Sequence, residues 1–375
     1  MEAHPTPARM PLESPDSAQE LILAANKKAS ASFAGYKAKE DEGRYLGKDV
    51  LIKCMCSDGR VDPTMDFRDP DEAFRREQRP MAGNRWFMDA EFLAADTVEK
   101  LDAYFSTNEA KIKAVFTMLF DDLLSKDPQP SIDLEAHAAE KESHHHGCGA
   151  HGSNAAAALT ETAKDAYLLR KVYPGIRIIR TMKYTDSGVV VPARLADSTA
   201  LTAEGTKTGI PQGLRKMVAE FDLQVGDLEE PGHGVYRTHK GNPHNIDMEH
   251  HNERILRVSM NHQAFHAIAE GEEGAEQALR LSYIPDVAFL AQWLQTLEGI
   301  IEKNYLKNNA GEPIILHLDV PKGNSELADL RKHLLSAVKI NPVLGRMIKE
   351  NKLFVVLTET DLETYVATAQ KEEEL

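Results

Sequence analysis

Apolar residues recur at helical spacing in five segments of the chain. In the first half these segments are residues 17–39, 98–125 and 155–173. In the second half they are residues 287–305 and 326–338. Side chains three and four positions apart share one face of a helix, so this spacing predicts amphipathic helices that cover an apolar core.

Strand-like patterns lie between these helices. Residues 49–55 form a short continuous apolar run, and residues 131–136 alternate apolar with polar side chains. Residues 175–181 and 188–191 flank a turn, whereas the charged segment 66–79 is expected to be a loop. Alternation of strands and helices predicts an α/β fold with a mixed β-sheet flanked by helices.

The order of these patterns recurs in the second half of the chain. The matched pairs are 253–261 with 49–57, 312–320 with 130–138, and 352–367 with 176–191. A chain of 375 residues also exceeds the length at which one hydrophobic core usually stops growing. Together these features predict two half-units of similar architecture.

Composition and charge limit the class of protein. Hydrophobic residues make up 42% and charged residues 27% of the chain, the balance of a soluble globular protein. A net charge of -15 argues against binding the phosphate backbone of nucleic acid. No apolar segment approaches the roughly 18 residues of a membrane span, and no signal peptide is recognisable at the N-terminus. We therefore expect a cytoplasmic protein with neither a nucleic-acid nor a membrane partner.

Cysteine usage indicates a metal site. The chain has three cysteines, Cys54, Cys56 and Cys148, too few for a disulfide framework. Cys56 follows a predicted strand and Cys148 precedes a predicted helix, where thiolate ligands of zinc can be held. Cys54 is expected to be a small buried apolar residue.

Asp58 and Arg60 lie directly after Cys56. Arg60 can hold the Asp58 carboxylate in a charge-assisted pair, which leaves that carboxylate able to accept a hydrogen bond from a zinc-bound water molecule. A surface salt bridge is the competing interpretation of such a pair.

The motif C-x-D-x-R at Cys56, Asp58 and Arg60, followed by H-x-x-C-G at 145–149, resembles the signature of the β-class carbonic anhydrases. An A-G-N segment at 82–84 and Y-T-D-S-G at 184–188 are similar to that family too. The resemblance implies Zn²⁺ held by two cysteines and a histidine, with Asp58 and Arg60 as catalytic residues. It also implies hydration of carbon dioxide to bicarbonate by attack of zinc-bound hydroxide, and it is compatible with a homo-oligomer.

Two histidines compete for the position of the third ligand. His137 directly follows a predicted strand, as in the family, whereas His145 has the family's spacing to Cys148. The chain resembles the carboxysomal shell carbonic anhydrases, a divergent branch with a wider His-to-Cys spacing and a degenerate second half. This resemblance implies one active and one inactive half packed as an internal pseudo-dimer. We favour His137 over His145, and we expect His144, His146 and His151 to be solvated.

The resemblance divides the chain into four segments. These are an N-terminal helical arm (1–47), a catalytic zinc-binding half (48–197), a linker or lid (198–252) and a degenerate half without metal ligands (253–375). One zinc ion per chain is the expected stoichiometry. Two other functions remain open: hydrolysis of carbon disulfide or carbonyl sulfide on the same fold, and a non-catalytic zinc-stabilised binding protein.

Overall fold

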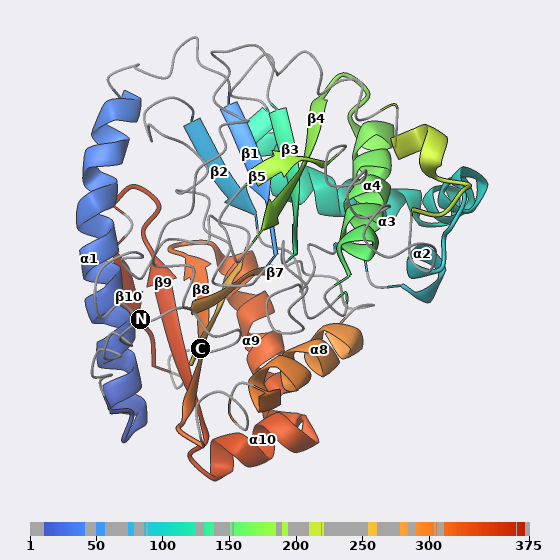
Figure 1. Ribbon diagram of the computed structural model, residues 1–375. Coiled ribbons are helices and arrows are strands. Elements are labelled where there is room, and N and C mark those ends of the chain that lie inside the picture. Colours follow the sequence, from blue (N-terminus) through green and yellow to red (C-terminus); the bar gives the residue numbers. More distant parts are fainter. Residues whose placement is uncertain are drawn as a thin grey trace, which may run out of the picture. The chain divides into compact units, whose positions relative to one another are not determined.

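The chain forms two compact units in a computed structural model (Figure 1). We call residues 45–250 the first-half unit, and residues 1–44 with 251–375 the second-half unit. The residues that the structure describes are 11–41, 50–56, 74–78, 86–87, 89–124, 131–138, 151, 154–184, 190–193, 210–218, 220, 254–260, 278–283, 290–303, 305, 311–364 and 366–371.

A five-stranded mixed sheet forms the centre of the first-half unit. Its strands are β1 (Val50–Cys54), β2 (Phe74–Gln78), β3 (Ser131–Ala138), β4 (Arg177–Tyr184) and β5 (Val190–Pro192), arranged in the order β2-β1-β3-β4-β5. The first four strands are parallel and β5 is antiparallel to β4. The helices are α2 (Ala90–Leu93), α3 (Val98–Leu124) and α4 (Ala155–Val172). Helix α4 packs on β3 and β4, and α3 packs beside α4.

The second-half unit has a sheet of the same topology. Its strands are β6 (Ile255–Met260), β7 (Ala278–Tyr283), β8 (Ile314–Pro321), β9 (Leu353–Thr360) and β10 (Ala367–Ala369), in the order β10-β9-β8-β6-β7. Again the fifth strand, β10, is antiparallel to its neighbour. The helices are α1 (Pro15–Asp41), α8 (Leu290–Lys303), α9 (Ser325–Ile340) and α10 (Pro342–Lys349).

The identical strand orders confirm the repeat that the sequence predicted, and the strand pairings define its register. In the first sheet Leu51, Ser131 and Arg177 are neighbours on β1, β3 and β4. The corresponding neighbours on β6, β8 and β9 of the second sheet are Ile255, Ile315 and Phe354. The match of 253–261 to 49–57 has this register. The other two predicted matches are shifted, by two residues at β8 and by one at β9. A one-residue shift exchanges the two faces of a strand, so only the pairings define which side chains correspond.

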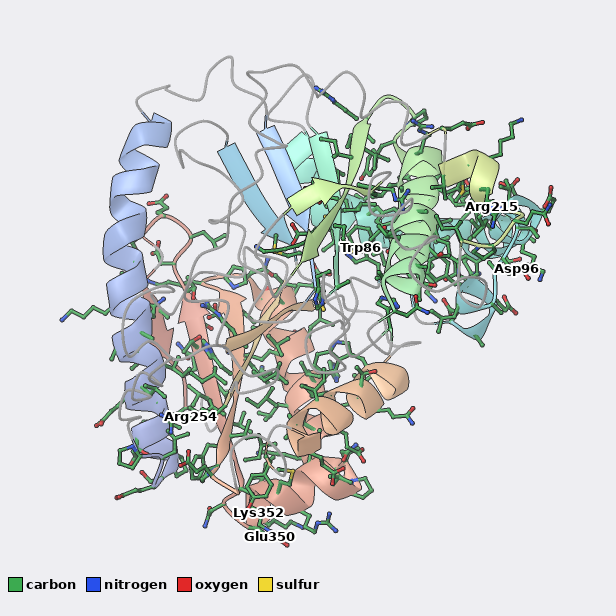
Figure 2. All side chains as sticks on the ribbon, in the orientation of Figure 1. Trp86, Asp96, Arg215, Arg254, Glu350 and Lys352 are labelled. Atoms are coloured by element: carbon green, nitrogen blue, oxygen red, sulfur yellow. The ribbon has the colours of Figure 1, made fainter. Side chains whose placement is uncertain are left out.

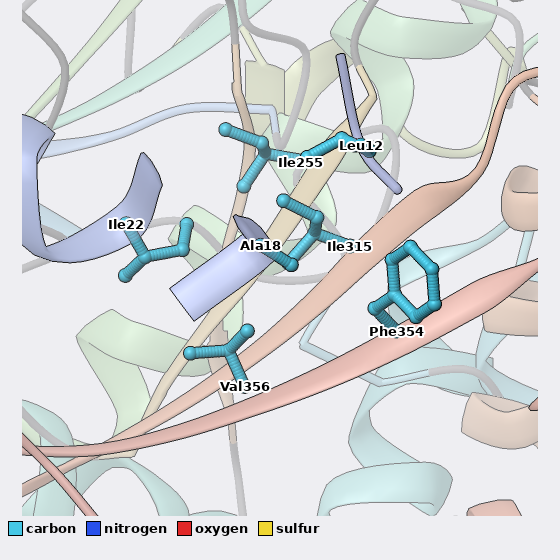
Figure 3. Close-up of a cluster of buried hydrophobic side chains, with 7 residues drawn as sticks. All are labelled: Leu12, Ala18, Ile22, Ile255, Ile315, Phe354 and Val356. Carbon is cyan, nitrogen blue, oxygen red and sulfur yellow. The ribbon is translucent and has the colours of Figure 1, made fainter. Parts of the chain in front are cut away.

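Helix α1 is part of the second-half unit although it begins the chain. Ala18 and Ile22 of α1 pack against Ile255, Ile315 and Val356 on one face of the sheet (Figure 3). The Asn26 side chain also accepts a hydrogen bond from the Ala367 backbone N–H of β10 (2.8 Å). An edge strand presents unpaired backbone groups, and α1 covers part of this edge. The sheet of the second-half unit is therefore completed by the N-terminal segment.

A tight turn connects α10 to β9. Asn351 adopts a left-handed conformation (φ 56°) and its backbone N–H donates to the Ile348 carbonyl oxygen at 3.1 Å. The Lys352 backbone N–H donates to the Met347 carbonyl oxygen at 2.8 Å, and its ammonium pairs with Glu350 at 2.5 Å (Figure 2). These two backbone bonds form a Schellman motif, which ends α10 and starts β9.

The α/β class and the principal helices agree with the sequence analysis, but one expected loop is wrong. Residues 74–78 of the predicted charged loop form β2, paired with β1. An edge strand has one neighbouring strand, and the charged sequence Phe-Arg-Arg-Glu-Gln lacks the apolar alternation that signals a strand. Among the described helices, none is long and apolar enough to cross a membrane.

Candidate metal centre

Cys56 and His137 come from neighbouring parallel strands. Cys56 lies two residues beyond the end of β1 and His137 is the penultimate residue of β3. Both side chains are buried, with 4% and 2% of their surface exposed. The carboxyl ends of paired parallel strands lie at one edge of the sheet, so the backbone places both residues at the same edge.

The strand order gives this edge particular significance. The chain passes from β1 to β2 on one side and then returns to β3 on the other side of β1. Connections that leave two adjacent strands in opposite directions leave a crevice at their carboxyl ends, where open α/β sheets bind ligands. Cys56 and His137 therefore lie at the carboxyl ends of the two strands, β1 and β3, that form the topological switch point of the first-half unit.

The remaining predicted site residues lie outside the described residues. These residues are Asp58, Arg60, His145 and Cys148. Within the part of the chain that the structure describes, no three His, Cys, Asp or Glu side chains are grouped as a metal would require. The structure thus brings two of the predicted ligands to one edge of the sheet, and the proposed ligand set needs Cys148 to be complete.

The start of α4 follows the predicted Cys148 position. Asn154 caps this helix, because its side chain accepts the Ala157 backbone N–H at 3.1 Å. His151 precedes the cap and is 8% exposed, so the expectation that it is solvated is wrong. Its backbone carbonyl accepts the Asn154 N–H at 3.0 Å, which places it in the turn that leads into the helix.

Arg180 ties β4 to the first half of α4. Its guanidinium donates to the Leu159 carbonyl oxygen at 2.9 Å and to the Thr162 hydroxyl at 3.4 Å. Arg180 is fully buried, and Thr162 in turn donates to the Leu159 carbonyl at 2.9 Å. Buried donors of this kind hold neighbouring elements in one geometry because leaving them without an acceptor is costly. The helix that follows the predicted ligand Cys148 is thereby fixed on the sheet.

Cys54 is completely buried at the end of β1. Burial raises the pKa of its thiol well above the usual value, and the nearby Asp133 and Asp165 carboxylates raise it further. A protonated thiol is a poor metal ligand. This environment agrees with the expectation that Cys54 is a buried apolar residue.

A layer of buried polar side chains surrounds His137, and the sequence analysis did not identify it as part of a site. We define the buried polar layer as Asp133, Glu135, His137, Thr181 and Lys183, each at most 2% exposed. Alternate residues of β3 and β4, such as Ala136 and Met182, pack on α4, so the layer lies on the opposite face. The Thr181 hydroxyl donates to the Asp133 carboxylate at 2.8 Å. The alternation in residues 131–138 contained this signal, because three polar residues share one face of a central strand.

The corresponding edge of the second-half unit lacks the cysteines and histidine of the motif. In the register of the sheets, Met260 replaces Cys56 and Pro321 replaces His137. The connection from β8 to α9 is the three-residue segment 322–324, which contains neither Cys nor His. This edge cannot rebuild the predicted ligand set.

No protein-family model matches the chain, and no curated protein matches it either.

Proposed function

We propose that the chain is a zinc-dependent enzyme that hydrates carbon dioxide to bicarbonate, with Cys56, His137 and Cys148 as metal ligands. The observation that carries the proposal is the position of Cys56 and His137, buried at the carboxyl edge of the switch point between β1 and β3. The resemblance of the C-x-D-x-R and H-x-x-C-G motifs to β-class carbonic anhydrases supports the same function.

The donor set fits zinc. A thiolate and an imidazole are preferred zinc ligands, and a catalytic zinc site uses three protein ligands with one position left open. When bound, zinc supplies a water nucleophile at neutral pH by lowering the pKa of that water from 15.7 to about 7. Cys56 and His137 lie at the carboxyl ends of adjacent strands, and Cys148 lies in the segment between β3 and α4.

The residues around the metal would control the reacting water. Asp58, paired with Arg60, would accept a hydrogen bond from the water and orient its lone pair toward carbon dioxide. The buried surroundings of Cys56 and His137 limit the access of bulk solvent. The proton released by the reaction would leave through a histidine of the 144–146 segment.

The strand position supports His137 as the third ligand. His137 is 2% exposed and lies near the carboxyl end of β3, a strand that contributes to the switch point. We further propose one zinc ion per chain, because the second-half unit has Met260 and Pro321 where the first-half unit has Cys56 and His137. An active half would then pack with an inactive one as a pseudo-dimer in the cytoplasm.

Bound zinc and turnover test the proposal on the same samples. We expect the wild-type chain to bind one zinc ion and to catalyse hydration in a stopped-flow assay, with activity that rises toward alkaline pH. Cys56→Ser and His137→Ala should each lose zinc and activity, whereas His145→Ala should keep both. Zinc that stays stoichiometric in His137→Ala would contradict the choice of that histidine.

Two further outcomes separate the other functions. Turnover of carbon disulfide or carbonyl sulfide without hydration of carbon dioxide would indicate a hydrolase on the same metal site. Stoichiometric zinc without turnover of any of these substrates at any pH would indicate a zinc-stabilised binding protein.

A further inference from the structure

We call residues that lie side by side on neighbouring strands a row. Both sheets bury ionisable side chains in corresponding rows. On the face opposite α4, one row of the first-half unit contains Glu135 and Thr181, and the corresponding row of the second-half unit contains Asp319 and Thr358. All four side chains are fully buried. A carboxylate on the third parallel strand of each sheet is therefore a shared feature of the two halves.

Four short contacts define what the carboxylate does in the second-half unit. The Asp319 carboxylate pairs with Arg257 at 2.8 Å and accepts hydrogen bonds from the hydroxyls of Thr358 and Thr360, the latter at 2.8 Å to each oxygen. The Thr358 hydroxyl also lies 2.7 Å from His317 Nε2. A carboxylate in this row thus binds side chains on both neighbouring strands, and each of its oxygens accepts hydrogen bonds.

The hydrogen bond from Thr360 shows in which direction the Asp319 carboxylate reaches. Thr360 lies one row closer to the carboxyl edge of the sheet than Asp319, on the neighbouring strand. The carboxylate therefore reaches toward the edge where the first-half unit carries the proposed metal ligand. Glutamate is one methylene longer than aspartate, so the Glu135 side chain is long enough to reach that row.

That next row holds different residues in the two halves. The first-half unit has His137 directly beside Lys183, whereas the second-half unit has Pro321 beside Thr360. Glu135 and His137 are two residues apart on β3, with roughly 7 Å between their Cα atoms at strand spacing. Both lie on the same face and both are at most 2% exposed. Where the second-half unit has Pro321, the first-half unit thus has the imidazole of His137 within reach of the buried Glu135 carboxylate.

We propose that Glu135 is a positioning residue for His137, orienting the imidazole ring for the metal while Lys183 balances the carboxylate charge. The inference rests on the proposed function, in which His137 binds zinc. A metal-ligating histidine typically donates its second ring N–H to a carboxylate or carbonyl, which fixes the ring and increases its basicity. A buried carboxylate also requires a cation or hydrogen-bond donors, and the neighbouring row contains the buried Lys183.

Glu135→Gln is the test, with Asp319→Asn as the matched control at the corresponding row of the other half. Zinc affinity is measured by competition with a chromophoric chelator, ligand geometry by the visible spectrum of the cobalt-substituted chain, and fold by the unfolding midpoint of metal-free protein. Glu135→Gln should weaken zinc binding about 10- to 100-fold and change the cobalt spectrum. Asp319→Asn should lower the unfolding midpoint of the second-half unit and leave zinc affinity unchanged. Glu135→Asp is measured in the same way if Glu135→Gln does not fold.

The outcomes distinguish this inference from the function on which it rests. Zinc affinity and a cobalt spectrum equal to wild type in Glu135→Gln, with His137→Ala still losing zinc, would overturn the role of Glu135 alone. Equal loss of zinc affinity in Asp319→Asn would also overturn it, because any loss of a buried charge would then weaken the site. A wild-type chain that binds no zinc would overturn both proposals.

Discussion

Removal of the Asp319 carboxylate should destabilise the second-half unit strongly. The side chain is fully buried and pairs with Arg257, which is 1% exposed, at 2.8 Å. In Asp319→Ala the guanidinium loses this carboxylate, and the hydroxyls of Thr358 and Thr360 lose their acceptor. No solvent replaces these partners, since the whole cluster is buried.

The expected cost follows from these contacts. Removing one partner of a buried ion pair costs about 3–5 kcal/mol. The lost threonine hydrogen bonds are not added in full to this cost, because the energies of coupled contacts do not add. For a unit of this size the cost corresponds to a decrease in Tm of about 6–20 °C. Replacing both charges, in Arg257→Met with Asp319→Leu, should restore most of the stability because no charge is left buried without its partner.

Hydrogen exchange of β8 and β9 is the appropriate assay. A chain with two units need not unfold in one step, so a probe confined to the second-half unit is required. Asp319→Ala should accelerate exchange in both strands under conditions where they exchange through global opening of the unit. A measured cost below about 1 kcal/mol, the value of one ordinary hydrogen bond, would refute the reasoning. A double variant as unstable as the single variant would refute it too.

Three other predictions test separate parts of the fold. A Cβ at Gly345 would lie 2.2 Å from a backbone oxygen of α9, so Gly345→Ala should lower the stability of the unit by about 1–3 kcal/mol in a denaturant titration. A Cβ at Gly299 of α8 would meet nothing within 4 Å, so Gly299→Ala should stabilise the unit slightly in the same titration. Asn351 has φ 56°, so Asn351→Ala should cost about 1 kcal/mol while Asn351→Gly does not; equal midpoints for the two variants would contradict this. Two hydrogen bonds hold the pKa of Asp102 below its usual value, the larger effect from Lys171 and the smaller from Tyr167. Asp102 should therefore stabilise the α3–α4 contact above the usual carboxyl pKa and lose that contribution as pH falls through the lowered value, and Asp102→Asn should flatten this acid dependence of unfolding.

Most elements of the two sheets could be predicted from sequence because their apolar residues are periodic. The helices α3 and α4 and the strands β1 and β3 lie within a few residues of their expected bounds. Strand β2 was missed because its charged residues resemble a loop, and an edge strand needs fewer apolar contacts. Local patterns thus report burial on a face, and they fail where an element has little buried surface.

The candidate site was predictable in its residue types and less so in its surroundings. Cys56 and His137 could be named because thiolates and imidazoles with strand-end spacing are typical of zinc sites. Glu135 and Lys183 could not be assigned a role, since polar residues alternating on a strand normally indicate a solvated face. Their complete burial depends on what covers that face of the sheet, and no local pattern reports it.

The sequence by itself determined the α/β class, the repeated order of strands and helices, and the candidate ligands. These properties depend on side-chain chemistry and on spacing between near neighbours. Only the tertiary structure decided that α1 completes the second-half sheet, that β1 and β3 are adjacent, and that Glu135 and Asp319 share a row. The physical reason is that strand pairing and register join residues tens to hundreds of positions apart, and hydrogen bonds between backbones carry no signature in the side chains.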